Sequence, residues 1–322
     1  MEILTADDID FSKYLIETEP HQNVRPAHEY VTDLLDKLKN PDQTKKLYLP
    51  WDKTRASFNF RRKEVTIWQG ANGGGKSLIT GMVAMSLMAQ GEKVCIASFE
   101  MKPQTTIQRM LRQYCQTNPY SEAYQGNDGL EMLTLLYREF AGWSKDRLWL
   151  YDQQGTVQAE QVIAVARYCA KELGATHFFI DSLMKCVRGE DDYNGQKEFV
   201  DELTSLARDN DIHIHLVHHI KKPPSEDHKP GKYDGKGSGA ISDLADNLFS
   251  IWRNKAKENA YKIGKISDAQ MHEPDSTLSC QKQRNGDEEP LIALWFDKDS
   301  TQYVGERGAC PLYMPLFPHR KE

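Results

Sequence analysis

The sequence predicts an α/β protein with a mostly parallel, twisted sheet, antiparallel strands late in the chain and a helical arm at the N-terminus. From about residue 56, apolar strand-like runs alternate with segments of helical period, which is typical of parallel strands joined by right-handed helical crossovers. A glycine-rich segment links the first of these strands to the first helix. The last three strand-like runs follow one another through short turns, so we expect the late edge of the sheet to be antiparallel.

Apolar runs bounded by turn residues predict the strands, and apolar stripes with a spacing of three and four residues predict the helices. The expected strands are Val65–Gln69, Val94–Phe99, Leu148–Tyr151, His177–Asp181, Ile212–His218, Leu248–Trp252, Thr277–Gln283 and Leu291–Phe296. The expected helices are Lys76–Gln90, Gln104–Thr117, Leu130–Ala141, Gln158–Leu173 and Gln196–Arg208. Gly91 and Gly174 follow two of these helices, where a C-terminal glycine commonly ends a helix.

The first part of the chain lacks this alternation. Within it, the segment Ala27–Asn40 is bounded by prolines and carries Val31, Leu34, Leu35 and Leu38 on one helical face. This narrow apolar stripe packs either on its own domain or on a neighbouring subunit, and the sequence leaves both open. We therefore expect three parts, which are an arm with a linker helix (1–55), a main domain (56–304) and a C-terminal tail (305–322).

Composition restricts the classes of function. The chain has 322 residues, 39% hydrophobic and 27% charged, which suits a globular protein of one large or two small domains. Its net charge of −6 provides no global basic field, so any nucleic-acid contact must come from local basic segments. No apolar run approaches the roughly 18 residues that span a bilayer, and no secretory signal is visible. The six cysteines lack Cys-x-x-Cys spacing, and we expect an intracellular protein in a reducing compartment, without membrane contact.

The segment Gly70-Ala71-Asn72-Gly73-Gly74-Gly75-Lys76-Ser77 is an intact G-x-x-x-x-G-K-S motif between an expected strand and an expected helix. Glycines let backbone N–H groups converge on phosphate oxygens, and the N-terminus of the following helix favours negative charge. In such a motif Lys76 reaches the β and γ phosphates, and Ser77 coordinates Mg²⁺. The sequence therefore predicts a site for ATP, or another nucleoside triphosphate, with Mg²⁺, formed by residues Gly70 to Leu78.

Two carboxylates stand at the ends of expected strands, where sheets of this kind bind ligands. Asp181 ends an apolar run, which is a Walker B arrangement that would hold the Mg²⁺ ion. Glu100 follows the strand Val94–Phe99 and is the candidate that orients and deprotonates the attacking water. The alternative for Glu100 is a solvated strand-end carboxylate or a cap for the helix after Pro103.

The strand around residue 215 is rich in histidine. His213 and His215 alternate with apolar residues and so share one face of the strand, but no cysteine or carboxylate stands near them at ligand spacing, which disfavours a metal site. His219 lies at the end of this strand, and it fits a hydrogen-bonding sensor of the γ-phosphate. A solvated strand-end histidine is the remaining option.

The loop that follows, from Lys221 to Gly239, carries five lysines against three acids, a local charge of 5 − 3 = +2 in an acidic protein. Lysines, glycine N–H groups and a serine hydroxyl are the groups that a single-strand phosphate backbone needs. A solvated charged face is the alternative, but the position directly after the sensor strand favours DNA contact. The residues concerned are Lys221, Lys222, Lys236, Gly237 and Ser238.

A cationic pair ends a late strand. Lys282 and Arg284 are two residues apart and therefore point to the same side of that strand. If this side faces the ATP of a neighbouring subunit, the two side chains act in trans, with Arg284 as an arginine finger. In a monomer they would be ordinary turn charges.

Taken in order, these blocks resemble the RecA-fold ring helicases of the DnaB type (superfamily 4), especially the helicase domain of phage primase-helicases and of the mitochondrial helicase Twinkle. The resemblance covers about residues 46 to 300 and includes Leu49-Pro50-Trp51 and Ser98-Phe99-Glu100-Met101. It implies that the loop residues named above line a central DNA channel, and that Arg253 and Phe296 flank the nucleotide base. Trp252, where relatives often carry an acid, and Lys236, where an arginine is common, depart from the pattern.

The resemblance implies an ATP-dependent replicative DNA helicase that translocates on single-stranded DNA as a ring, 5′→3′, without a primase module. Such a protein would be a homo-hexamer or heptamer in the cytoplasm (of the host, if phage-encoded), with a separate primase, polymerase or loader as partner. The alternative is an ATP-switched single-strand DNA-binding protein, of the recombinase or helicase-loader type, that does not unwind. A small-molecule kinase is disfavoured because no lid-like, arginine-rich segment stands near the glycine-rich motif.

Overall fold

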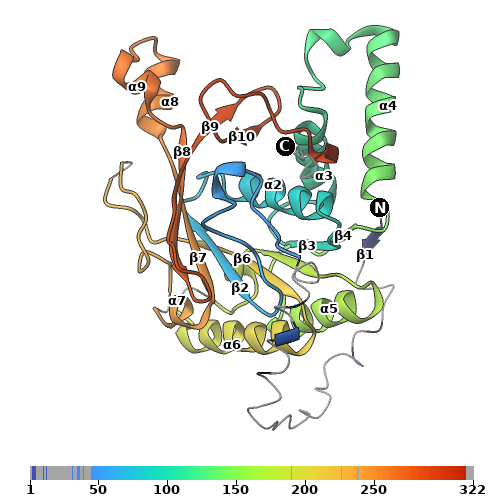
Figure 1. Ribbon diagram of the computed structural model, residues 1–322, viewed down its shortest axis with the longest axis vertical. Coiled ribbons are helices and arrows are strands. Elements are labelled where there is room, and N and C mark those ends of the chain that lie inside the picture. The colour runs from blue at the N-terminus through green and yellow to red at the C-terminus, as the bar shows by residue number, and fades with distance from the viewer. Residues whose placement is uncertain are drawn as a thin grey trace.

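The computed structural model describes residues 2–4, 10, 12, 31, 35, 36, 39, 45–189, 191–225, 227–237 and 239–316. Within them a ten-stranded sheet has the order β1-β4-β3-β5-β6-β2-β7-β8-β9-β10 (Figure 1). The six pairings from β1 to β7 are parallel, and the three from β7 to β10 are antiparallel. The strands are β1 (Glu2–Leu4), β2 (Val65–Gly70), β3 (Val94–Ser98), β4 (Leu148–Tyr151), β5 (His177–Asp181), β6 (His213–His219), β7 (Asn247–Arg253), β8 (Ser276–Gln283), β9 (Leu291–Asp297) and β10 (Gln302–Val304). The expected mostly parallel sheet with antiparallel late strands is confirmed.

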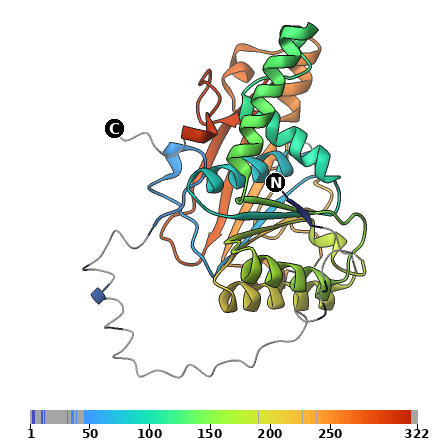
Figure 2. The same ribbon diagram turned by 90° about the vertical axis from the view of Figure 1, so that its right-hand side faces the viewer.

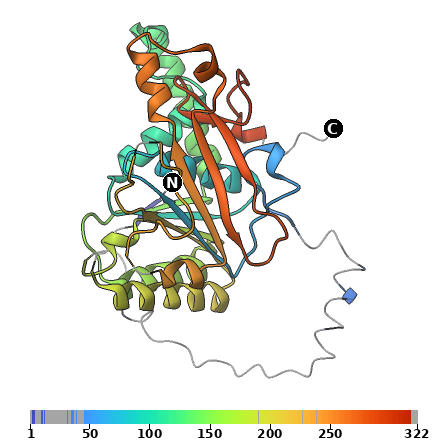
Figure 3. The same ribbon diagram turned by 90° about the vertical axis from the view of Figure 1, so that its left-hand side faces the viewer.

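Helices cover both faces of the sheet (Figures 2 and 3). On one side lie α2 (Lys76–Ala89) and α3 (Pro103–Cys115), from which α4 (Gly126–Ser144) extends outward. On the other side lie α5 (Ala159–Glu172), α6 (Tyr193–Asp209) and the short α7 (Ala240–Leu244). Short 3₁₀ helices occupy Asp52–Thr54, Glu122–Tyr124, Leu183–Lys185 and Met314–Leu316. Among the described helices, none is both long enough and apolar enough to cross a bilayer.

Each expected strand and helix from residue 65 onward is present, with ends shifted by no more than four residues. The expected short turn between the strands now named β7 and β8 is wrong, because α8 (Lys255–Lys262) and α9 (Asp268–His272) stand between them. Neither helix buries a residue, so neither carries the apolar stripe by which a helix is recognised in sequence. Strands β1 and β10 and helix α7 were also not predicted, and most of the expected helix Ala27–Asn40 lies outside the described residues.

Two apolar layers hold the sheet in place. One is formed by residues of α5 and α6 against the sheet, and the other by residues of α2 and α3. The second layer also buries Leu47, Leu49 and Trp51, and the Trp51 indole N–H donates to the Tyr303 carbonyl at 2.7 Å. Met314 is buried in the same layer. Chain on both sides of residues 56–304 therefore packs into this core.

Three buried histidines stack against one another at the amino ends of β5 and β6. Trp68 Nε1 donates to His215 Nδ1 at 3.2 Å, and His215 Nε2 lies 3.0 Å from His177 Nδ1. Thr66 Oγ1 lies 2.8 Å from His213 Nε2, whose other ring nitrogen contacts a backbone carbonyl. These bonds can all form when the rings are neutral, and a second proton on His177 or His215 would sit on a nitrogen that already accepts a hydrogen bond. Burial accordingly lowers the pKa of all three, that of His213 to about 4.

The neutral histidines make the fold sensitive to acid. A lowered pKa means that the unfolded chain takes up protons first, so stability is retained above about pH 6.5 and lost as the pH falls towards 4. The penalty for His213 alone is about 3 kcal/mol, and the raised pKa of Glu64 offsets part of it. Urea unfolding at about pH 7.5 and about pH 5 should show this loss. His177→Phe should reduce the difference between the free energies of unfolding at the two pH values, whereas His272→Ala, on exposed α9, should leave that difference unchanged. Equal stability of the native protein at both pH values would contradict the account.

Candidate functional site

The carboxyl ends of five adjacent parallel strands meet at one edge of the sheet. In spatial order β3, β5, β6, β2 and β7 end at Ser98, Asp181, His219, Gly70 and Arg253. The ends lie within two residues of one another, because Ser98 pairs with Asp181, Asp181 pairs with Val217, and Gly70 pairs with both His219 and Ile251. Side chains that follow these ends are therefore neighbours in space although they are far apart in sequence.

The glycine-rich motif forms the loop between β2 and α2. Gly73 and Gly75 have φ values of +69° and +89°, which L side chains rarely adopt. A β-carbon on Gly75 would also lie 2.5 Å from the Tyr303 hydroxyl, so β10 packs directly under the loop. Lys76, 7% exposed, donates from Nζ to the carbonyls of Gly70 (3.0 Å) and Ala71 (2.9 Å). Burial lowers the pKa of Lys76, while the nearby Asp181 and Glu100 oppose that shift.

The serine of the motif and the carboxylate of β5 lie together. Ser77 Oγ donates to Asp181 Oδ2 at 2.8 Å, and Asp181 is only 7% exposed. Burial raises the pKa of Asp181, and the bond from Ser77 lowers it. A hydroxyl and a carboxylate that are paired at the floor of a phosphate site suit a Mg²⁺ ion, which prefers oxygen ligands and keeps several waters. Among the described residues, no cluster of three or more His, Cys, Asp or Glu side chains could hold a metal by itself.

Glu100 is held by two donors. Ser182 Oγ donates to Glu100 Oε1 at 2.8 Å, and His219 Nε2 lies 3.1 Å from the same oxygen. Since an ionised carboxylate only accepts, His219 Nε2 is the donor in this pair. The bond from His219 is the largest cause that lowers the pKa of Glu100 to about 2, although burial opposes it. Glu100 is therefore ionised and oriented rather than freely solvated, and it does not cap the following helix, whose N-cap Lys102 has no side-chain cap.

These residues line a cavity of about 720 Å³ that runs along the loop from Asn72 to Leu78. Six further residues that line the cavity were not predicted from the sequence. They are Thr105, Gln108, Arg109 and Arg112 of α3, together with Tyr120 and Thr301. Their spacing of three, four and seven residues places the four α3 side chains on one helical face, which was a partial signal. Two arginines, Arg109 and Arg112, thus lie near the glycine-rich loop. A small-molecule kinase was disfavoured because no arginine-rich segment was expected there, and this argument is therefore weakened.

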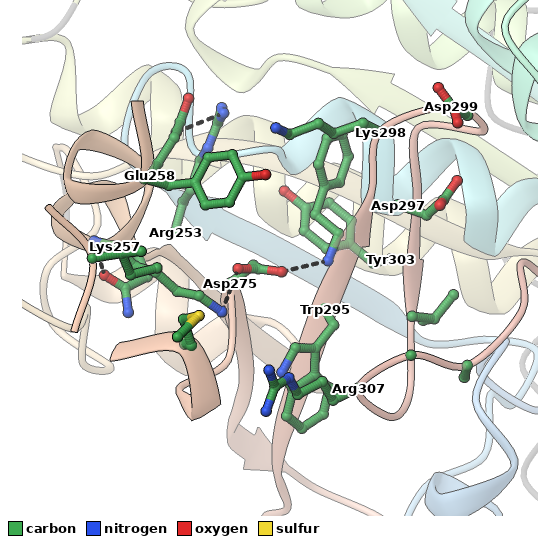
Figure 4. A pocket seen from close by; sticks show the side chains of 18 of the residues that line it. Arg253, Lys257, Glu258, Asp275, Trp295, Asp297, Lys298, Asp299, Tyr303 and Arg307 are labelled. Carbon is green, nitrogen blue, oxygen red and sulfur yellow. Dashed lines mark hydrogen bonds and ion pairs between the residues drawn. The ribbon is translucent and has the colours of Figure 1, made fainter. Parts of the chain in front are cut away.

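Figure 4 shows side chains that line a second cavity, of about 570 Å³. Arg253 lines both, donates from one guanidinium nitrogen to the Gly73 carbonyl at 3.1 Å and pairs with Glu258 at 2.8 Å. Phe296 lines the second cavity, and its ring centroid lies 5.1 Å from that of Tyr303. The two residues expected at the nucleotide base are therefore brought to one cavity beside the phosphate loop.

The basic loop after β6 lies at the same edge of the sheet, on the left side of Figure 1. Lys221 and Lys222 are exposed, and Lys236 and Gly237 are partly buried. The Lys236 backbone N–H donates to the His219 carbonyl at 2.8 Å, so the loop returns directly to the end of β6. Ser238 lies outside the described residues.

Lys282 and Arg284 are not part of this cluster. Gln283 between them pairs with Asn247, while Gly70 pairs with Ile251, so the cationic pair is at least roughly 13 Å away, towards the amino ends of the parallel strands. Lys282 Nζ donates to carbonyls at the end of α7, at 2.7–3.0 Å. Arg284 pairs with Asp246 at 3.0 Å and contacts the same turn. Both side chains do lie on one side of the strand, as expected.

The family model described as DnaB-like helicase C terminal domain matches residues 54–305. A DNA helicase/primase of Enterobacteria phage T3 is 24% identical over 209 residues, which cover 61% of this chain and 36% of that protein. The chain therefore spans little more than a third of that relative. Among solved structures, one described as an ATPase domain has a TM-score of 0.72 at 16% identity, over 87% of this chain and 99% of that one. A DnaB-like replicative helicase, solved in a study of its interactions with primase, has a TM-score of 0.70 at 16% identity, over 88% and 67%.

Because this family model matches residues 54–305, well over half of the chain, the chain belongs to the family of DnaB-like helicase C-terminal domains.

Proposed function

We propose that this protein is the ATP-driven motor of a replicative DNA helicase, which translocates along single-stranded DNA as a ring of six, or seven, copies in the 5′→3′ direction. The observation that carries the proposal is the alignment of Ser77, Asp181, Glu100 and His219 along one sheet edge in a member of this family. The protein would act with a separate primase, polymerase or loader. In this view the expected helix Ala27–Asn40 is the part of the arm that contacts the next copy.

The phosphates of ATP would lie on the loop from Gly70 to Leu78, with Lys76 released from the Gly70 and Ala71 carbonyls to meet them. Ser77 and Asp181 would hold Mg²⁺, which neutralises charge on the phosphates. Arg253 stands between the phosphate cavity and the second cavity and would contact the base together with Phe296. These roles use side chains that the fold already holds in place.

Glu100 orients the attacking water. Its pKa of about 2 makes it a weak proton acceptor, so its main contribution is position and charge rather than strong basicity. A loose phosphoryl-transfer transition state depends on such positioning. His219, bonded to Glu100 and joined by its carbonyl to the basic loop, would link the γ-phosphate to the DNA-contacting lysines.

Lys282 and Arg284 would serve the ATP site of the neighbouring copy. Their distance from the phosphate loop of their own chain leaves a site in trans as the one place where they could meet a nucleotide. Bonds to the end of α7 and to Asp246 hold Lys282 near the end of β8 and Arg284 directly after it. Hydrolysis would then require assembly.

Glu100→Gln should bind an ATP analogue with nearly native affinity but hydrolyse ATP at least about 10²-fold more slowly, because the oriented carboxylate is lost. Nucleotide binding by fluorescence and steady-state phosphate release measure the two effects. Glu160→Gln, on the exposed surface of α5, is the matched control. Hydrolysis within about threefold of native would remove Glu100 from the mechanism.

Mixing two inactive variants tests the trans role. Lys76→Ala disables the phosphate loop and Arg284→Ala disables the finger, so each alone should lack DNA-stimulated hydrolysis. In mixed rings the intact phosphate loop of an Arg284→Ala copy would face the intact Arg284 of a Lys76→Ala copy. The rate of DNA-stimulated hydrolysis should then rise well above the mean rate of the two variants measured separately. Lys76→Ala mixed with Glu100→Gln is the control that must stay inactive, since both defects lie in the same site. A mixture that stays inactive although it forms rings would refute the trans assignment.

Unwinding itself is tested on forked duplexes with a 5′ or a 3′ single-stranded tail. We expect strand separation that needs ATP and the 5′ tail, and none by Glu100→Gln. ATP-dependent binding of single strands without strand separation would instead favour the switched DNA-binding protein. Separation from the 3′ tail would overturn the direction alone.

A further inference from the structure

The basic loop presents an aromatic side chain that the proposed function does not use. Tyr233 is 69% exposed and lies between Lys229 and Lys236 in the sequence, next to Lys232. We propose that Tyr233 is a stacking platform for a nucleobase of the single strand held by this loop. The inference rests on the proposed function, because it needs a single strand at this position.

The loop is fixed on both sides of Tyr233. An antiparallel bridge joins Ile220 to Gly235, and the Lys221 N–H donates to the Asp234 carbonyl at 2.9 Å. The Asp234 carboxylate also accepts from the Gly231 N–H at 2.8 Å. Tyr233 therefore stands on a closed turn, and a ring that is positioned before binding loses little freedom when a base stacks on it.

The surroundings of the ring suit a nucleic-acid strand. Lys232 Nζ lies 5.3 Å from the centroid of the Tyr233 ring and 3.7 Å from an oxygen of Asp243. A cation on one side of a ring that is 69% exposed leaves the rest of that ring open to a planar base. Lys221 and Lys222 are exposed, and the Lys221 N–H donates to the carbonyl of Asp234, the residue after Tyr233. Both lysines can therefore reach phosphates next to the base. Aromatic stacking of this kind tolerates any sequence, as a translocating protein requires.

The turn is also attached to the strands that end in the nucleotide site. Gln69, the residue before Gly70, donates from Nε2 to the Gly231 carbonyl at 2.7 Å and to Ser250 Oγ at 2.8 Å. Lys229 Nζ lies 4.9 Å from the centroid of the Trp252 ring, next to Arg253. A base on Tyr233 would thus be held by a turn that is anchored to both β2 and β7.

The test compares two oligonucleotides of equal length, one of thymidines and one of abasic sites, which share the phosphate backbone and differ in bases. Binding is measured by fluorescence anisotropy with a non-hydrolysable ATP analogue. The native protein should prefer the thymidine strand by about tenfold. Tyr233→Ala should lose this preference and keep its affinity for the abasic strand, whereas Tyr233→Phe should retain both. Tyr137→Ala, on the distant helix α4, is the matched control.

Salt dependence gives an independent readout. Tyr233→Ala should leave the slope of affinity against salt concentration unchanged, while Lys222→Ala should reduce it. The stacking role is overturned if the native protein binds both strands equally, or if Tyr233→Ala weakens both alike, and the proposed function survives either result. A native protein that binds neither strand would overturn the proposed function and the inference with it.

Discussion

The whole arrangement depends on the parallel pairing of β3, β5, β6, β2 and β7. Backbone hydrogen bonds fix the register, and the register brings the carboxyl ends of the five strands within two residues of one another. Residues at these ends and just after them contact one another, as the Ser77–Asp181 and Glu100–His219 pairs do. The site is therefore a property of the sheet, and the two apolar layers that cover the sheet also hold the site in shape.

Much of the site could be predicted because its signals are local. The motif from Gly70 to Ser77 needs only a strand, a loop and a helix in sequence, and Asp181 and Glu100 need only a strand that ends in an acid. The spacing of Arg109 and Arg112 places them on one helical face. Whether that face points towards the glycine-rich loop depends on how α3 packs, and the sequence pattern does not show this. Tyr303 supports Gly75 from β10, a strand of three residues that is too short to show a pattern.

The parts of the fold that escaped prediction share a physical reason. Helices α8 and α9 bury no side chain, so their residues carry no apolar period. Strand β1 pairs with β4 at the edge of the sheet over only three residues. Conversely, a strand such as β3 is buried along its length and begins with four apolar residues in a row, and such a run is the signal of a central parallel strand.

The Asp246 carboxylate connects Arg284 to the start of β2. It accepts from the Val65 N–H and from Arg284. Six buried residues later the same strand becomes the phosphate loop, a span of roughly 20 Å that extended backbone cannot stretch. A displacement of the Arg284 guanidinium would therefore act on the start of the strand that ends in the phosphate loop. If Arg284 has the role in trans proposed for it, the contact with a neighbouring copy and the phosphate loop of the same chain are joined by one salt bridge and one buried strand.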